Sequence, residues 1–373
     1  MPLEPSDAPA CAAALREAAG AGRTLRVRGG GTKDGLGELL PTDEVLLTTS
    51  LRGVVDHVPA DLTCTVRAGT RIAELRSALA AQGQFLPLDP PHAGATVGGV
   101  IAANSNGFGT LRYGAVRNLL IGTTTALADG TIARAGGRVV KNVAGYDLNK
   151  LLVGSFGTLG VIVEATFKVL PLPAARGGSV RRVGGAAEGF ALADGIIRRS
   201  LRPTALLVER HGREWRLIVA AAGEQAVVDR TVREAGGDAV ADPETVVGPL
   251  RELPATAHEG ALIRVVLPLA AQAAFADSAV RLDGVDHLVA DAGSGAALVH
   301  VRGDDATVAA SAAACMASAH VLGGVARAER RAPGVLARVA PHGGERPPGH
   351  FLMRRVKDLF DPRGILEPGR SIV

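Results

Sequence analysis

The sequence predicts an α+β protein with two domains and a C-terminal segment that returns to the first domain. Three observations predict this class. The chain has 373 residues, which suits two domains of about 150 residues each. Short apolar β-type runs alternate with amphipathic helical runs along most of it. The segment PLPAARGG, residues 171–178, is typical of a linker, because proline and glycine interrupt regular structure. The expected boundaries are 1–172, 178–330 and 345–373.

The first domain is expected to begin with a capped, acidic helix in the stretch MPLEPSDAPACAAALREAAG. This stretch lacks the basic and apolar regions of a secretory signal, so none is expected. A second helix is expected from Ile72, with Thr70 as its N-cap. Asp129-Gly130 predicts a hairpin turn. The strands expected in this domain are 25–28, 54–58, 63–67, 119–127, 131–135 and 160–170.

The second domain shows one order of elements twice, strand-helix-strand-strand-helix-strand, which is the ferredoxin-like order. The first copy is expected at strand 180–183, helix 186–199, strands 205–209 and 215–220, and helix 224–235, with its last strand unassigned. The second copy is expected at strand 261–267, helix 270–280, strands 285–290 and 297–302, helix 306–319 and strand 321–326. A short helix from Phe351 and the irregular segment FDPRGILEPGR complete the expected elements.

Composition excludes several classes of function. The net charge is +4 and no dense run of lysine or arginine occurs, which disfavours a nucleic-acid partner and suits an anionic substrate or an acidic partner subunit. Cys11, Cys64 and Cys315 are far apart, so we expect buried thiols in a reducing compartment rather than disulfides or an iron–sulfur site. The longest uncharged stretch, 306–326, is too weakly apolar for a direct membrane span.

Glycine-rich segments mark the candidate binding site. RGGGTK, residues 28–33, follows a predicted strand, and its glycines let backbone N–H groups turn around an anion. It matches neither the Walker loop nor G-x-G-x-x-G. Residues 87–118 and 139–169 carry two further glycine-rich stretches that bury little apolar surface. Each stretch alone could be a plain loop, but three of them favour a large polar ligand that uses their backbone donors.

These segments resemble the FAD domain of the vanillyl-alcohol-oxidase and p-cresol-methylhydroxylase (PCMH) family. The resemblance covers about residues 20–172 and the tail, and within the family it is strongest to the E subunits of bacterial glycolate oxidase. The motifs that carry it are RGGGT, GATVGGVIAAN, RYGAVRNLLIG, GYDLNKLLVGSFGTLGVI and FDPRGILEPGR. The implied fold is a PCMH-type FAD domain of two α+β subdomains, followed by the ferredoxin-like antiparallel cap.

The resemblance also implies roles for individual residues. The pyrophosphate of FAD is expected at the glycine loop, the diphosphate and flavin edge at the second segment, the adenosine half at the third, and the isoalloxazine near the tail. The residues that carry these roles are Arg28, Gly29, Gly30, Gly31 and Thr32; Thr96, Val97, Gly98, Gly99 and Asn104; Gly157, Gly160 and Ile162; and Arg370.

Departures from the family pattern add further expectations. Relatives that bind FAD covalently often use a histidine just after the glycine loop, where this chain has Thr32 and Lys33, so FAD is expected to be non-covalent. Phe156 and Glu367 replace a glutamate and an asparagine that are common in the family. The metal-binding motif G-D-G-N-x-H of the family's hydroxy-acid dehydrogenases does not occur, and we assign no metal.

Oxidation of a hydroxy acid by a flavin needs a base for the hydroxyl proton and a cation for the carboxylate. His300 and Arg302 lie two residues apart on a predicted strand, so both side chains face the same way and could supply both groups, although an exposed polar strand face is the favoured explanation. His92 lies in the second glycine-rich segment, where a loop-structuring role is the simpler explanation.

The function expected from the resemblance is that of an FAD-binding subunit of a glycolate oxidase-type complex. It would act on a small 2-hydroxy acid in the cytoplasm, beside a larger FAD subunit and an iron–sulfur subunit that accepts the electrons. Any membrane association would be through these partners. Two alternatives stay open: a self-sufficient FAD oxidase or dehydrogenase, and a structural subunit that binds FAD weakly or not at all.

Overall fold

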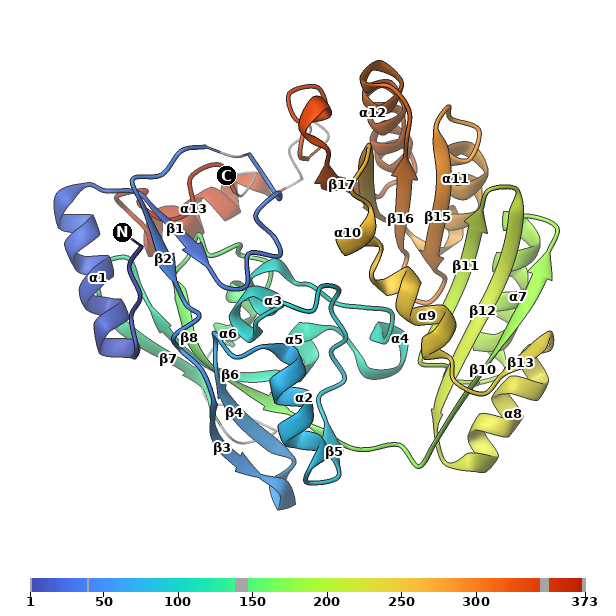
Figure 1. Ribbon diagram of the computed structural model, residues 1–373, viewed down its shortest axis with the longest axis horizontal. Helices are drawn as coiled ribbons and strands as arrows, with labels where there is room; N and C mark the ends of the chain where they lie inside the picture. The colour runs from blue at the N-terminus through green and yellow to red at the C-terminus, as the bar shows by residue number, and fades with distance from the viewer. Residues whose placement is uncertain (1, 39, 138–146, 343–348, 371–373) are drawn as a thin grey trace. The chain divides into compact units, whose positions relative to one another are not determined.

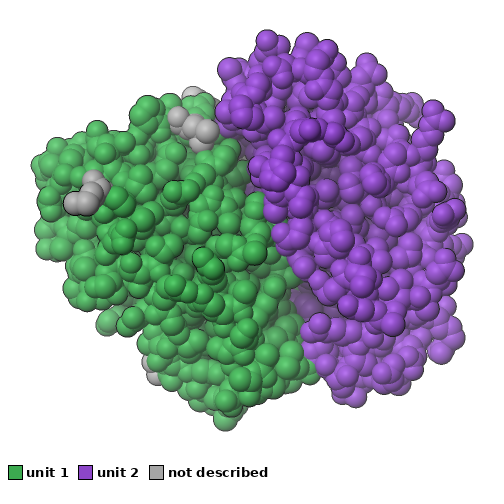
Figure 2. Space-filling model, viewed as in Figure 1, with its two compact units in different colours: residues 1–106, 114–172, 346–373 green, residues 107–113, 173–345 purple. Residues whose placement is uncertain are grey.

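The computed structural model describes residues 2–38, 40–137, 147–342 and 349–370. The chain divides into two compact units (Figure 2). The first unit comprises residues 1–106, 114–172 and 346–373, and the second comprises residues 107–113 and 173–345. The C-terminal segment therefore belongs to the first unit, as the sequence predicts.

An antiparallel sheet in the order β3-β4-β8-β6-β7 forms the centre of the first unit. Helices α2 and α3 pack on this sheet. The core that they share with it includes Leu75, Ile101 and Phe167. The elements named here are β3 (Val54–Val58), β4 (Thr63–Arg67), α2 (Ile72–Ala80), α3 (Val97–Ala103), β6 (Leu120–Ala126), β7 (Ile132–Gly136) and β8 (Val161–Lys168). The shorter elements of this unit are β5 (Gln84–Phe85), α5 (Val116–Leu119), α6 (Asn149–Leu152) and β9 (Leu170–Pro171).

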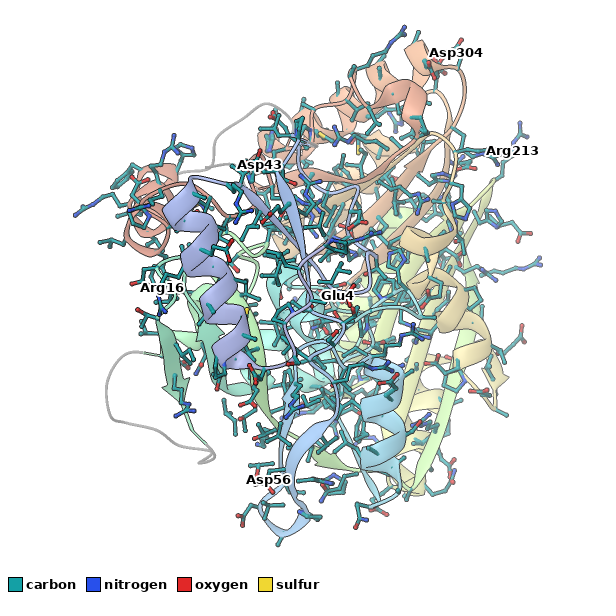
Figure 3. The ribbon with its side chains drawn as sticks, turned by 60° about the vertical axis from the view of Figure 1, so that its left-hand side comes forward. Glu4, Arg16, Asp43, Asp56, Arg213 and Asp304 are labelled. Atoms are coloured by element: carbon teal, nitrogen blue, oxygen red, sulfur yellow. The ribbon has the colours of Figure 1, made fainter. Side chains whose placement is uncertain are left out.

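A parallel pair, β1 (Leu25–Arg28) and β2 (Glu44–Leu47), forms a second layer of the first unit. Helix α1 (Ala8–Ala21), on which Figure 3 labels Arg16, packs on it through Cys11 and Leu15. The Arg16 guanidinium donates to the carbonyl oxygen of Gly130 at 3.0 Å. The C-terminal helix α13 (His350–Phe360) precedes a tail that pairs with β1 through Leu366 (Figure 1). The tail, β1 and β2 are therefore parallel neighbours at Leu25, where β1 begins.

The second unit is built on one eight-stranded antiparallel sheet in the order β13-β10-β12-β11-β15-β16-β14-β17. Each half has the ferredoxin-like order, and the halves join through their second strands, β11 and β15. The strands are β10 (Ala175–Val183), β11 (Ala205–His211), β12 (Glu214–Gly223), β13 (Asp238–Val240), β14 (Ala261–Val266), β15 (Val285–Asp291), β16 (Ala296–Val301) and β17 (Val325–Arg331). The sequence expectation of a repeated unit is confirmed, and β13 supplies its unassigned strand.

Four helices cover one face of this sheet: α7 (Ala186–Arg198), α8 (Gln225–Ala235), α11 (Gln272–Ala279) and α12 (Asp305–Val321). Two short helices, α9 (Glu244–Arg251) and α10 (Leu253–Thr256), lie on the other face, where Leu250 packs against Leu207 and Ile218 (Figure 1). The helix-covered face buries most of the apolar core, and the other face also carries charged side chains.

A short segment of the glycine-rich stretch, residues 107–113, belongs to the second unit. It contains α4 (Thr110–Tyr113), and Phe108 packs in the same cluster as Leu207. The Thr110 hydroxyl donates to Asp291 at 3.2 Å, and burial raises the pKa of that carboxyl. The residues that follow Asn106 are therefore fixed on the second sheet.

Several expected boundaries are wrong. The linker is shorter than PLPAARGG, because β10 begins at Ala175. The last strand lies at 325–331, since α12 continues to Val321. The Thr70 hydroxyl does not cap α2 but accepts from the N–H of Gly53 at 2.9 Å.

The three cysteines are free and buried, as expected, and burial raises the pKa of the Cys11 thiol to about 12. Over the ranges given above, no helix combines the length and the apolar character that crossing a bilayer requires.

Candidate cofactor site

The glycine loop directly after β1 offers a row of unused backbone donors. Within the part of the chain that the structure describes, the N–H groups of Gly29, Gly30, Gly31 and Thr32 have no hydrogen-bond acceptor. Gly31 has φ +71°, a left-handed conformation that glycine adopts without strain. Consecutive free N–H groups form the kind of concave donor set that binds a phosphate or pyrophosphate. The loop could therefore hold the pyrophosphate that the sequence predicts there.

Two of these glycines allow the loop to pack directly on the second glycine-rich segment. A Cβ atom on Gly29 would lie 2.3 Å from the Thr96 hydroxyl oxygen. A Cβ atom on Gly30 would lie 1.8 Å from the carbonyl oxygen of Gly94. The missing side chains therefore make room for other parts of the chain, Thr96 and the backbone at Gly94.

The second segment shapes the site more than it supplies donors. Thr96 is buried and caps α3 by accepting from the Gly99 N–H. The N–H groups of Val97 and Gly98 donate to the carbonyl oxygens of Thr70 and Ala68, at 2.9 and 2.7 Å. These two residues can line a cofactor, but their N–H groups are already used.

Asn104 ends α3 in a left-handed conformation, with φ +47°, and turns the chain into Ser105 and Asn106. The side-chain amide nitrogen of Asn106 is buried and has no hydrogen-bond partner among the described residues. A buried donor without a partner costs about 1–3 kcal/mol, so it marks a place where a polar ligand group is missing. Sequence reasoning did not single out Asn106, although it lies between Asn104 and a glycine.

The third segment contributes Gly157, Gly160 and Ile162. Gly157 has φ +81°, and a Cβ atom there would lie 3.3 Å from the Glu367 side chain. At Gly160 a Cβ atom would lie 2.8 Å from the Thr125 methyl group. The Ile162 side chain is buried in the core, which leaves only its backbone for a cofactor. Residues 138–146, which contain most of VVKNVAGYD, lie outside the described residues.

Thr125 of β6 is a second feature that the sequence did not reveal. Its hydroxyl oxygen is buried beside Gly160 and has no partner in the described ranges. Together with the Asn106 amide, it supplies an unused polar atom near two of the glycine-rich segments. Because these atoms and the N–H row fit a polar ligand, the residues present are compatible with FAD.

Strained backbone concentrates in the same segments. Among the described residues, four of the six non-glycine residues with positive φ belong to the glycine-rich stretches or the tail: His92, Asn104, Phe156 and Glu367. Left-handed conformations of such residues cost about 1–3 kcal/mol and cluster at functional sites. Phe156 keeps its conformation because its N–H donates to the Ala102 carbonyl oxygen at 2.8 Å.

Arg370, which is expected near the isoalloxazine, makes its contacts with the chain's own backbone. Its side chain is buried, and Nη1 donates to the carbonyl oxygens of Lys33, Asp34 and Leu36, at 2.9, 2.9 and 2.5 Å. Nε donates to Glu367 at 3.1 Å. The guanidinium is thus directed at the segment that follows the glycine loop.

The proposed catalytic pair lies in the second unit and is already matched by acids. His300 Nδ1 lies 3.0 Å from Asp286, and the Arg302 guanidinium pairs with Glu259 and lies 3.6 Å from Asp286. The structure brings His300 and Arg302 together, but two carboxylates neutralise the arginine. A substrate carboxylate would have to displace them, so the polar strand face is the better description of this pair.

A more buried charged cluster lies on the neighbouring strands. Glu209 of β11 accepts from His287 at 2.9 Å and pairs with Arg216 at 2.6 Å, and the His211 and His287 rings stack 4.7 Å apart. No set of three or more histidine, cysteine, aspartate or glutamate side chains within the described ranges is placed to hold a metal ion.

Acid is expected to destabilise the second unit through Glu209. Burial raises the pKa of this carboxyl, but the His287 hydrogen bond and the Arg216 charge outweigh it, so the pKa lies below its ordinary value. The stabilisation is therefore complete above the ordinary pKa and is lost as the pH falls through the folded-state pKa. We expect Glu209→Gln to lower the free energy of unfolding by about 1–3 kcal/mol at neutral pH and by less in acid.

Urea unfolding followed by the fluorescence of Trp215, the single tryptophan, reports on this unit. A difference between wild type and variant that stays constant from neutral to acidic pH would contradict the expectation.

The fold and the donor-rich loop of the first unit are compatible with an FAD-binding domain. The sequence model of the family described as "FAD binding domain" matches residues 2–136, so this part of the chain belongs to that family. The expected cofactor, FAD, is confirmed by this match.

Similar curated proteins include the glycolate oxidase subunit GlcE of Escherichia coli, which is 42% identical over 153 residues, 40% of this chain and 43% of that protein. The glycolate oxidase subunit GlcD of Bacillus subtilis is 41% identical over 149 residues, 39% of this chain and 32% of that protein. A D-lactate dehydrogenase of Archaeoglobus fulgidus is 38% identical over 171 residues, 45% of this chain and 38% of that protein. The matched region spans less than half of each of these relatives.

Among solved structures, an alkyldihydroxyacetonephosphate synthase is similar over 97% of this chain and 75% of its own, with a TM-score of 0.72 and 17% identity. At this identity the likeness concerns the fold alone. It extends beyond the FAD-binding domain, because it covers nearly the whole chain and therefore both units.

FAD is expected to be released when the chain is denatured. Thr32 and Lys33 follow the glycines, and neither side chain is the histidine that forms the covalent bond in flavinylated relatives. After acid or heat precipitation, all flavin fluorescence should be in the supernatant. Fluorescence that migrates with the denatured polypeptide on a gel would contradict a non-covalent cofactor.

Proposed function

We propose that this chain is the FAD-containing subunit of a glycolate oxidase-type complex that oxidises small 2-hydroxy acids and passes the electrons to an iron–sulfur partner. The observation that carries the proposal is the similarity to glycolate oxidase subunits across a region that contains the unused donor row of the glycine loop. On this proposal the chain is part of an FAD-dependent oxidoreductase.

The chain's own residues would bind and orient the cofactor. The N–H groups of Gly29–Thr32 would hold the pyrophosphate, and the Asn106 amide and the Thr125 hydroxyl would each gain a polar partner. When bound, FAD supplies the acceptor for the electron pair that leaves the α-carbon of the hydroxy acid. The protein's contribution is to place that acceptor and to keep water from it.

A second electron carrier must lie on another chain if the complex delivers single electrons onward. Iron–sulfur clusters are held by several cysteine thiolates close together. Cys11, Cys64 and Cys315 are instead separate and buried in three different cores. This chain would therefore need an iron–sulfur partner, which is part of the proposal.

Helix α13 offers a surface for such a partner. Phe351, Leu352 and Leu359 are 64%, 52% and 79% exposed, and the basic residues Arg354 and Arg355 lie among them. Exposed apolar residues in such density on one helix are typical of an interaction site. The chemistry suits a partner surface that is apolar at its centre and acidic at its rim.

Purification of the tagged chain from its host, with and without its partners, tests the proposal. The isolated chain should carry FAD, and the complex should additionally carry iron and acid-labile sulfide on another subunit. Leu359→Asp should keep the FAD of the chain but lose the co-purifying subunits, whereas Asp358→Asn on the same helix should lose neither.

The two alternatives predict different results. A structural subunit would purify without a flavin spectrum. A self-sufficient enzyme would purify alone and turn over a hydroxy acid with an artificial electron acceptor.

A further inference from the structure

The C-terminal tail runs beside the strand that leads into the glycine loop. Leu25 of β1 donates its N–H to the Ile365 carbonyl oxygen at 2.7 Å, and the Glu367 N–H donates to the Leu25 carbonyl oxygen at 2.9 Å. Asp361, which is buried, fixes the tail by accepting from the N–H groups of Ile365 and Leu366, at 3.0 and 2.8 Å. The tail is thus hydrogen-bonded to the first residue of β1, the strand that leads into the loop.

Glu367 holds the entry to the loop. Its carboxylate is buried. Oε1 accepts a hydrogen bond from the Val27 N–H at 2.6 Å, and Oε2 accepts one from Arg370 Nε at 3.1 Å. The residue keeps a left-handed conformation, with φ +49°, to make both contacts. Val27 lies two residues before the first glycine, so the carboxylate restrains the backbone just ahead of the donor row.

Arg370 holds the exit from the loop. Its nitrogen Nη1 lies within hydrogen-bond distance of three carbonyl oxygens in the four residues that follow Thr32, those of Lys33, Asp34 and Leu36. The Glu38 N–H also donates to the Gly369 carbonyl oxygen at 2.8 Å. The loop is closed further by Arg28, whose guanidinium pairs with Asp34 at 2.7 Å.

Both ends of the donor row are therefore restrained by three residues of the tail, Glu367, Gly369 and Arg370. A row of N–H groups binds an anion well only when its groups converge before the ligand arrives, because binding otherwise includes the cost of ordering the loop. We infer that Glu367 and Arg370 are positioning residues for the pyrophosphate loop and that the tail determines how tightly the chain holds FAD. This inference rests on FAD binding by the first unit, and not on the identity of the hydroxy-acid substrate.

The test measures affinity rather than activity. FAD is removed from the full-length chain, and the apo-protein is titrated with FAD and, separately, with ADP, which carries the pyrophosphate without the isoalloxazine. Arg370→Gln should weaken both ligands by about 10- to 100-fold, because charge-assisted hydrogen bonds to the loop are lost. Arg370→Lys should weaken both by less, since one cation remains to bind the carbonyl oxygens.

Arg363 provides a matched control in the same tail. Its guanidinium donates to the carbonyl oxygen of Ala19 in α1, and within the described residues it makes no hydrogen bond or ion pair with the loop. Arg363→Gln should lower the melting temperature of the apo-protein without changing either affinity. If Arg363→Gln and Arg370→Gln weaken FAD equally, the tail is merely structural and the inference is overturned.

The two ligands separate the remaining outcomes. Weakened FAD with unchanged ADP would mean that Arg370 contacts the flavin itself, and it would also overturn the inference. If Arg370→Gln does not fold, Arg370→Lys and Glu367→Gln decide, and unchanged affinities in both would overturn it. A wild-type chain that binds neither ligand would instead contradict the proposed function.

Discussion

Gly30→Val is expected to abolish retention of FAD by a chain that still folds. The first atom of the new side chain would lie 1.8 Å from the Gly94 carbonyl oxygen, far inside van der Waals contact. The Cβ atom is fixed to the backbone of residue 30, and the carbonyl oxygen is part of the backbone of Gly94, so neither can rotate away. The glycine loop must therefore move off the second segment. The row of N–H groups from Gly29 to Thr32 then loses the arrangement that suits a pyrophosphate.

The structure changes the physical reason for this prediction. From the sequence alone, a valine is expected to fill space that the pyrophosphate needs. The geometry shows that the chain's own backbone fills this space, so the defect acts on the shape of the loop. Alanine should therefore be nearly as damaging as valine, because the clash begins at Cβ.

Gly35 is a matched control in the same segment. A Cβ atom there would meet no atom within 4 Å, and its φ is not in the left-handed range. Flavin per protein after gel filtration and far-UV circular dichroism should show normal values for Gly35→Val. They should show lost flavin and native secondary structure for Gly30→Val, with about 1–3 kcal/mol less stability. Full flavin occupancy in Gly30→Val would show that the loop is only a turn.

The parts of the site that the sequence predicts are those that depend on glycine. Backbone donors need close approach and left-handed conformations, and glycine is the residue that allows both, so RGGGTK and the two later segments stand out. Gly31, Gly157 and Gly160 all have positive φ, as such segments require. The pattern of short apolar runs likewise predicts the strands, because residues on the core-facing side alternate.

The parts that the sequence does not predict depend on contacts between distant segments. Asn106 and Thr125 are ordinary polar residues in the sequence, and only burial without a partner marks them. Arg370 meets the carbonyl oxygens of Lys33 and Asp34 across more than 330 positions, and no local pattern indicates that contact. The acids that neutralise Arg302 also come from other segments. Glu259 lies just before β14, and Asp286 lies near the start of β15.

The largest expected effect on chemistry is that the isolated chain, loaded with FAD, oxidises glycolate poorly or not at all. On our proposal, the loop that follows β1 holds the cofactor. Few groups could bind and deprotonate the substrate. The base and cation suggested by the sequence, His300 and Arg302, are paired with Asp286 and Glu259. A carboxylate substrate would be repelled by two acids rather than bound by one free arginine.

The missing catalytic groups should lower the rate of flavin reduction by a measurable factor. Loss of a positioned general base costs about 10²–10⁴-fold in rate, and a missing carboxylate clamp gives up part of the gain from orientation. We therefore expect slow or absent bleaching of the flavin absorption band when the loaded chain is mixed anaerobically with glycolate or D-lactate. Dithionite should bleach the same sample completely, which shows that the flavin is competent.

The same experiment on the complex provides the contrast. Addition of the co-purified partner subunits should restore rapid bleaching by the substrate, if the reacting groups come from the larger flavin subunit. Glu259→Gln with Asp286→Asn tests the role of the acids in the isolated chain. This double variant frees Arg302 from its ion pairs, and any substrate-dependent bleaching that it gains would locate a latent carboxylate site on the second unit. Rapid, complete bleaching of the wild-type chain alone would overturn the subunit proposal and favour the self-sufficient enzyme, because the chain would then hold both halves of the reaction.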